Sequence, residues 1–130
     1  MAALPLYANA QAPAAAPSDT LTLPSGVRVQ TVLSSTSGAR PAADSVVLVR
    51  YRGMLENGRE FDSSRGQSVQ LPLNRVIACW TEGLQQLTIG TRARLFCPSA
   101  TAYGKRGAGG GVIPPDANLI FEIELVDILP

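Results

Sequence analysis

Three stretches of the chain alternate apolar and polar residues with a period of two, and this pattern constrains the fold more than any other feature. The stretches are SVVLVRYRG (45–53), RARLFC (92–97) and NLIFEIELV (118–126). Successive side chains of a strand point to opposite faces of its sheet, so each stretch predicts a strand with one buried face. Arginines in the first two stretches and glutamates in the third mark the exposed face. Half-exposed strands of this kind are typical of an antiparallel sheet.

One segment, NRVIACWTEGLQQL (74–87), has a helical pattern instead. Asn74 can cap the start of the helix, and Gly83 inside the segment predicts that the helix is short. Its apolar residues recur on one helix face: Ile77, Trp80, Leu84 and Leu87.

A turn signal separates the first strand from the next part of the chain. Asn57-Gly58 predicts a hairpin turn in which both central residues have positive φ. With the three strands and the helical segment, this turn predicts an α+β fold, an antiparallel β-sheet wrapped around one short α-helix.

The N-terminal segment differs in composition from the rest of the 130 residues. Residues 1–21 are rich in alanine and proline and predict a disordered tail, whereas residues 22–130 predict one domain. Small residues at Ala8 and Ala10 resemble the cleavage region of a secretory signal, but a basic segment and a full apolar segment do not precede them. A plain tail and the remnant of an export signal remain two interpretations.

Charge and residue usage exclude several classes of function. The net charge is +1, which argues against a dedicated nucleic-acid binder. The chain contains no histidine, so neither Ser-His-Asp nor Cys-His catalysis nor a histidine metal site is available. No apolar run is long enough to span a bilayer. We therefore expect no cofactor and no metal.

The two cysteines allow two interpretations. Cys79 and Cys97 match no zinc or redox-motif spacing. They can be two buried thiols or one disulfide. We favour thiols, because a free cysteine behaves as a small core hydrophobe.

A glycine-rich segment at 104–111 raises the question of a phosphate site. The dinucleotide fingerprint fails, because the sixth position from Gly107 is Val112. A phosphate loop fails as well, because Arg106 stands where serine or threonine is needed. The letters GKRG match the clamp of a KH-type RNA binder, but that clamp joins two helices and neither flank is helical.

An architectural role for the same segment agrees better with its composition. Its glycines let the backbone fold tightly, and Pro114-Pro115 stiffens the exit. We expect this loop to hold Tyr103 and Ile113 at fixed positions around a hollow.

Three long blocks carry a resemblance to a known family. They are VRYRGMLENGREFDSSRG (49–66), NRVIACWTEGLQQLTIGTRARL (74–95) and TAYGKRGAGGGVIPPDANLIFEIELVDI (101–128). In this order they resemble the FKBP-type peptidyl-prolyl isomerases, and LPSG at 23–26 is similar to the bacterial members. The resemblance implies isomerisation of X-Pro bonds in protein substrates, assistance to folding, and binding of macrolides of the tacrolimus type.

The resemblance also implies a set of site residues. The catalytic residues that it implies are Tyr51, Phe61, Asp62, Trp80, Tyr103 and Phe121. The substrate-binding residues that it implies are Val76, Ile77, Val112 and Ile113. Trp80 is expected to form the floor of an apolar pocket, and the Tyr103 hydroxyl and the Ile77 N–H are expected to orient the bound chain.

The sequence departs from the family pattern at three places. The strand before the helix lacks the usual aromatic, so that Val69 or Leu71 stands there. Cys79 occupies a position that is commonly glycine. Gly109–Gly111 carry no large apolar residue, so extended substrates would be gripped differently.

Two further hypotheses remain beside the isomerase. The missing aromatic favours a binding module or chaperone with little turnover, and GKRG favours an RNA binder. For the isomerase we expect proline-containing polypeptides as partners, no nucleic acid, and a monomer, because residues 1–21 are too short for the helical domain of dimeric bacterial relatives. A periplasmic or secreted location is expected, with the cytoplasm as the alternative.

Overall fold

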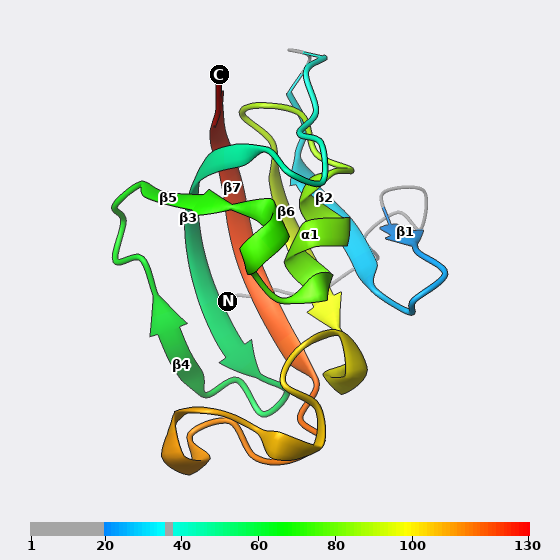
Figure 1. Cartoon of the computed structure of the whole chain (residues 1–130), viewed down its shortest axis with the longest axis vertical. Coiled ribbons are helices and arrows are strands. Elements are labelled where there is room, and N and C mark those ends of the chain that lie inside the picture. Colours follow the sequence, from blue (N-terminus) through cyan, green and yellow to red (C-terminus); the bar gives the residue numbers. More distant parts are fainter. Residues whose placement is uncertain (1–19, 36–37) are drawn as a thin grey trace, which may run out of the picture.

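A curved antiparallel sheet organises the computed structural model, which describes residues 20–35 and 38–130 (Figure 1). The strand order is β1-β2-β6-β7-β3-β4, and β5 also pairs with β3. The strands are β1 (Thr20–Thr22), β2 (Arg28–Leu33), β3 (Val46–Leu55), β4 (Glu60–Ser63), β5 (Val69–Pro72), β6 (Arg92–Cys97) and β7 (Leu119–Leu129).

The alternating stretches form β3, β6 and β7, as predicted. Their inward side chains pack against the helix α1 (Ala78–Leu84), which lies across the concave face in Figure 1. The buried strand residues are Val47, Val49, Ala93, Leu95, Cys97, Leu119, Phe121, Ile123 and Leu125. Burial of each large apolar side chain contributes about 1.5–3 kcal/mol, so this face carries much of the stability of the fold. The predicted α+β fold is confirmed.

Along one edge, strand β3 pairs first with β5 and then with β4. β5 pairs with Val46–Val49, whereas β4 pairs with Arg52–Met54. Between them Ser64 covers the backbone of Tyr51: the Tyr51 N–H donates to Ser64 Oγ (3.0 Å) and the Ser64 N–H donates to Tyr51 O (2.9 Å). The chain therefore leaves the sheet beside Tyr51, next to the concave face.

The helix is shorter than the pattern over 74–87 predicts. A 3₁₀ turn, η2 (Leu73–Arg75), comes first, and the extended residues Val76 and Ile77 separate it from α1. Asn74 lies in η2, and no side chain caps α1, so the predicted Asn74 cap is wrong. Val76 and Ile77 are β-branched, which disfavours helix. The Thr81 hydroxyl donates to Leu73 O (2.6 Å) and ties η2 to the helix.

The hairpin between β3 and β4 forms at the predicted place with a different turn. Gly58 has φ +89°, but Asn57 does not have positive φ. The predicted turn, in which both residues have positive φ, is therefore wrong. The Gly58 N–H donates to Leu55 O, and the Leu55 N–H donates to Arg59 O (both 2.9 Å). Asn57 acts through its side chain, whose Oδ1 accepts from the Arg59 N–H (2.9 Å).

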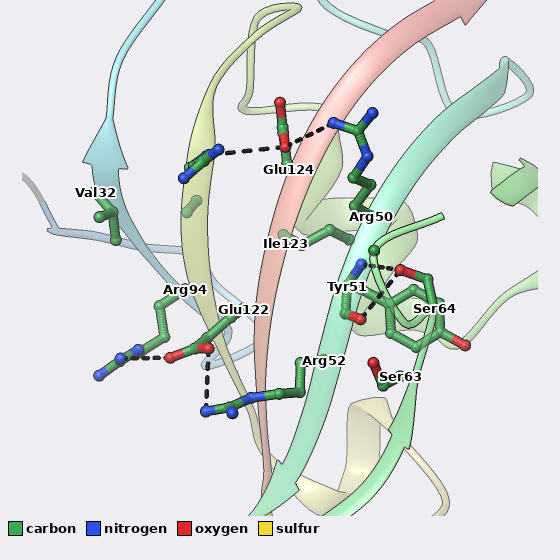
Figure 2. A pocket seen from close by; sticks show the side chains of 13 residues that line it. Val32, Arg50, Tyr51, Arg52, Ser63, Ser64, Arg94, Glu122, Ile123 and Glu124 are labelled. Atoms are coloured by element: carbon green, nitrogen blue, oxygen red, sulfur yellow. Dashed lines mark hydrogen bonds and ion pairs between the residues drawn. The ribbon is translucent and has the colours of Figure 1, made fainter. Parts of the chain in front are cut away.

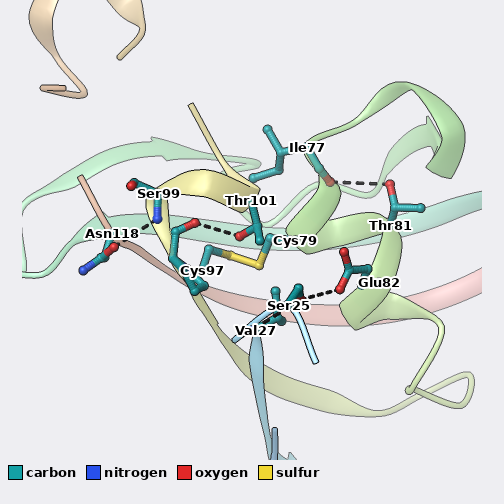
Figure 3. Close-up of a disulfide and its surroundings, with 11 residues drawn as sticks. Ser25, Val27, Ile77, Cys79, Thr81, Glu82, Cys97, Ser99, Thr101 and Asn118 are labelled. Atoms are coloured by element: carbon teal, nitrogen blue, oxygen red, sulfur yellow. Dashed lines mark hydrogen bonds between the residues drawn. A yellow bond between two sulfur atoms is a disulfide. The ribbon is translucent and has the colours of Figure 1, made fainter. Parts of the chain in front are cut away.

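The cysteines form a disulfide, so the preference for free thiols is wrong. Cys79 on α1 and Cys97 at the end of β6 are bonded, with their Cα atoms 5.6 Å apart (Figure 3). Both residues are buried. The physical reason is that the inward face of β6 ends directly beneath the helix, within the Cα separation that a disulfide needs. This proximity depends on the fold and is invisible in the spacing of the two residues.

The described part of the chain begins inside the predicted tail. Thr20 and Leu21 belong to β1, which pairs with Arg28–Gln30. The predictions for residues 1–19, including the export signal, lie outside the described residues. Among residues 20–35 and 38–130, no helix has the length and apolar character that a membrane span requires.

Candidate functional site

A pocket of about 430 Å³ opens beside the N-terminal end of α1. It is lined by residues of β3, β4, β5, η2, α1 and β7, and by Tyr103 from the segment after β6. The lining residues are Tyr51, Phe61, Asp62, Leu71, Arg75, Val76, Ile77, Trp80, Tyr103 and Phe121. The structure thus brings together eight of the ten residues that the sequence predicts for the site.

Trp80 forms the centre of an aromatic cluster in this pocket. Its ring centroid lies 4.9 Å from that of Tyr51 and 5.1 Å from that of Phe121, and Phe61 lies 5.6 Å from Phe121. All three pairs are edge-to-face, the arrangement that aromatic quadrupoles favour. Trp80 is only 5% exposed. The interlocked rings make a rigid apolar lining.

Gly53 makes room for two of these rings. A Cβ atom at Gly53 would lie 2.7 Å from Phe61 Cζ and 2.8 Å from Phe121 Cε1, so any side chain there would displace the rings. Sequence analysis did not single out Gly53. A glycine within a strand pattern is the signal that could have found it, because such a glycine often marks a close approach of another group.

Asp62 and Tyr51 form the polar edge of the pocket. The Tyr51 hydroxyl donates to Asp62 Oδ2 (2.8 Å), and the other carboxylate oxygen accepts from the Ser63 N–H (2.8 Å). Burial, followed by the hydrogen bond to Asp62 and its negative charge, raises the pKa of Tyr51 to about 12. Tyr51 therefore stays neutral, and both groups are held in place.

Several donors at the pocket have no partner in the described residues, among them the buried Trp80 Nε1–H. No described residue accepts a hydrogen bond from the Ile77 N–H or from the Tyr103 hydroxyl. Tyr103 is 39% exposed, so its hydroxyl is accessible. Unengaged donors beside an apolar hollow can bind carbonyl oxygens of a peptide chain.

The sequence lacks the aromatic residue that the family often has on the strand before the helix, and β5 shows what stands in its place. Leu71 lines the pocket, whereas Val69 does not. An aliphatic side chain therefore replaces the aromatic at this wall. Arg75, at the end of η2, also lines the pocket, and sequence analysis missed it because a single arginine carries no local signal of a site.

The glycine-rich loop lies outside the lining. Val112 is 49% exposed and Ile113 is 5% exposed, and neither lines the pocket. Ala108 and Ile113 exchange two backbone hydrogen bonds (3.0 and 3.1 Å). At Gly107, with φ +67°, a Cβ atom would lie 2.3 Å from Ile113 O. The loop is folded tightly against itself after Tyr103, as expected for its glycines. Of the two residues that it was expected to hold around the hollow, only Tyr103 lines the pocket, whereas Ile113 packs in the core.

The disulfide joins the helix that carries Trp80 to the sheet. Cys79 precedes Trp80 in α1, and its bond to Cys97 joins the helix to the end of β6 (Figure 3). The Ser25 hydroxyl also donates to Glu82 of the helix. Both contacts fix α1, and with it Trp80, relative to the sheet.

A second hollow, of about 440 Å³, lies over the outer face of the sheet and has a different character (Figure 2). Two glutamates there each join arginines of two neighbouring strands. The pairs are Glu124 with Arg50 (3.3 Å) and Arg92 (3.7 Å), and Glu122 with Arg52 (3.3 Å) and Arg94 (2.8 Å). Its lining carries four arginines and two glutamates, so it is a charged surface, unlike the aromatic pocket at Trp80.

Comparison with known proteins identifies the family. Residues 38–126 match the family model described as FKBP-type peptidyl-prolyl cis-trans isomerase. The chain is 45% identical over 106 residues to the FKBP-type peptidyl-prolyl cis-trans isomerase FkpA of Aeromonas hydrophila, covering 80% of this chain and 38% of that protein. It is 44% identical over 116 residues to the macrophage infectivity potentiator of Trypanosoma cruzi, covering 88% of this chain and 59% of that protein.

A solved structure agrees with these sequence matches. The peptidyl-prolyl cis-trans isomerase of Pseudomonas syringae superposes with a TM-score of 0.80 at 38% identity, over 86% of this chain and 82% of that one. The chain spans 38% and 59% of the lengths of the two curated relatives above. The family match, the fold and the aromatic pocket together place this chain in the FKBP-type peptidyl-prolyl cis-trans isomerase family.

Proposed function

We propose that the chain catalyses cis–trans isomerisation of X-Pro peptide bonds and that the Trp80 pocket is its active site. The observation that carries the proposal is the combination of a buried aromatic cluster with two unengaged donors, Ile77 N–H and Tyr103 hydroxyl. An apolar hollow with a few directed polar groups is the usual form of a site for a small or extended ligand.

The pocket would lower the rotation barrier by removing water. Rotation about the amide bond costs about 18–20 kcal/mol because it breaks C–N resonance. Water stabilises the planar, more polar amide, whereas the lining of Trp80, Phe61 and Phe121 does not. Binding in this pocket therefore favours the twisted amide over the planar one, which is differential binding of the transition state.

Hydrogen bonds would orient the substrate while its amide rotates. The proline ring would lie over Trp80, and the Ile77 N–H and the Tyr103 hydroxyl would hold carbonyl oxygens on either side. Tyr51 and Asp62 already bind each other, so they act as a fixed polar edge of the pocket. Each tenfold in rate corresponds to about 1.4 kcal/mol, so desolvation and a few such bonds are adequate in scale.

We further propose that the substrates are proline-containing polypeptides during folding and that macrolides of the tacrolimus type compete for the pocket. The disulfide supports a periplasmic or secreted location, because disulfides persist in oxidising compartments and are rare in the cytosol.

An isomerase assay tests the proposal. The purified chain should accelerate the cis-to-trans conversion of a peptide with the sequence Ala-Leu-Pro-Phe, and a macrolide of the tacrolimus type should abolish the acceleration. If the rate equals the uncatalysed rate at micromolar chain while the same peptide binds, the pocket is a binding module. If neither turnover nor binding occurs, the proposed function is wrong.

A further inference from the structure

Arg75 is the one cation among the side chains that line the pocket. It ends η2, directly before the two extended residues Val76 and Ile77. Its side chain is exposed, and no carboxylate of the described residues lies within ion-pair distance of it. The guanidinium is therefore available to a bound ligand.

Asp62, the other charged residue of the lining, forms no ion pair with Arg75. Both oxygens of Asp62 are engaged, one by the Tyr51 hydroxyl and one by the Ser63 N–H. Two more basic residues, Lys105 and Arg106, lie in η4 (Gly104–Arg106) outside the lining, and neither has an ion pair in the described part of the chain. Arg75 is therefore a lining cation without an ion-pair partner among the described residues.

The arginines of the outer face provide the contrast. Each of Arg50, Arg52, Arg92 and Arg94 lies within 3.7 Å of a glutamate oxygen. On that face each of these arginines has a glutamate partner on a neighbouring strand. At the pocket the chain presents a cation with no such match.

We propose that Arg75 makes the pocket select polypeptides that carry a carboxylate, Asp or Glu, on a residue adjacent to the bound proline. This inference rests on the proposed function, because it assumes that the proline occupies the Trp80 pocket. The Ile77 N–H that would bind the substrate backbone is only two residues from Arg75, so a residue next to the proline passes within reach of the guanidinium. Arginine binds carboxylates through two parallel hydrogen bonds, which favours this partner over a neutral side chain.

The expected preference is modest, because the pair forms at an exposed rim. Exposed ion pairs give about a two- to fivefold effect. The attraction acts on the ground state and on the twisted amide alike, so it should appear mainly as a lower KM and hardly in kcat. It should also weaken in molar salt, where charges are screened over about 3 Å.

The test uses matched peptides and two readouts. One series, Ala-Xaa-Pro-Phe, places Glu, Gln or Lys before the proline, and a second, Ala-Leu-Pro-Xaa, places the same residues after it. We would measure kcat/KM for isomerisation, and the Kd from the fluorescence of Trp80, the only tryptophan of the chain. The Kd reports the charge preference even if turnover is absent.

The variants Arg75→Gln and Arg75→Glu are compared with Arg59→Gln, which removes another exposed arginine from the β3–β4 turn, outside the pocket lining. In the wild type and in Arg59→Gln, the Glu peptide of at least one series should be preferred over Gln, and Gln over Lys. Arg75→Gln should remove this order and Arg75→Glu should reverse it. Equal values for the three peptides in the wild type, or an order that persists in Arg75→Gln, would overturn the inference. Binding with no turnover on any peptide would instead refute the isomerase proposal alone.

Discussion

The side chains of the pocket differ in how much they contribute to the stability of the fold and how much they contribute to the site. Trp80 is buried and packs on two rings, so it belongs to the core as well as to the site. The Tyr103 hydroxyl is accessible and has no partner among the described residues, so it belongs to the site alone. The sequence could suggest both residues through the family pattern, but it could not separate these weights, because they depend on burial and contacts.

Replacement of Trp80 should therefore cost more than replacement of Tyr103. Trp80→Ala leaves a large cavity and should lower the free energy of unfolding by about 3–5 kcal/mol, with loss of most isomerase activity. Tyr103→Phe should leave stability nearly unchanged and lower kcat/KM about two- to tenfold, the value of one hydrogen bond. Denaturant unfolding and the peptide assay check both variants. Loss of activity in Tyr103→Phe with activity retained in Trp80→Ala would contradict the desolvation mechanism.

The pKa of Tyr51 predicts a specific pH dependence of stability. Burial, the Asp62 hydrogen bond and the Asp62 charge raise this pKa to about 12, from 10.0 for an ordinary tyrosine. Between these values the unfolded chain releases a proton that the folded chain retains, so the free energy of unfolding falls as pH rises through that window and is unaffected below it.

Tyrosinate absorbance and alkaline unfolding measure this effect. One of the three tyrosines should titrate later than the others, and Tyr51→Phe should remove that late step and flatten the fall in stability between about pH 10 and about pH 12. A late step that persists in Tyr51→Phe would show that the wrong tyrosine was assigned.

The elements of the fold differ in how well their sequence patterns predict them. β3, β6 and β7 have one wet face, so a period of two shows them clearly in the sequence. The predicted extent of the helix was wrong, because a local 3.6-residue pattern cannot show that Val76 and Ile77 stay extended and line the pocket. The disulfide was not predicted for a related reason: it depends on where α1 meets the end of β6.

Removal of the disulfide should loosen the element that carries Trp80. The bond joins residues 18 positions apart, and a loop of about this size is worth about 3 kcal/mol. The double variant Cys79→Ala/Cys97→Ala should lose stability on this scale in denaturant unfolding.

Reducing agent provides the control for this variant. It should destabilise the wild type once unfolding exposes the buried bond, and it should leave the double variant unchanged. Equal stability of the oxidised wild type and the double variant would show that packing alone holds α1 on the sheet.

At the scale of the whole molecule, catalysis by desolvation and orientation predicts a flat pH profile. The chain has no histidine, the side chain that usually titrates near neutrality, and Cys79 is bonded to Cys97 and does not titrate. The value of kcat/KM on a neutral peptide should therefore be constant from about pH 6 to about pH 8. Asp62→Asn is the matched variant. If kcat/KM changes with pH in the wild type but not in Asp62→Asn, this carboxylate takes part in proton transfer.

The central claim is that this pocket turns over X-Pro bonds, and exchange NMR tests it most directly. A single-proline peptide is mixed with a small fraction of isotope-labelled chain, so that one sample reports both the cis–trans exchange rate and the positions that bind. The account predicts exchange that speeds up in proportion to the chain, with shifts concentrated at the Ile77 amide, the Trp80 indole and Tyr103. Exchange at the uncatalysed rate, or shifts concentrated at Arg50 and Arg92 on the outer face of the sheet, would contradict it.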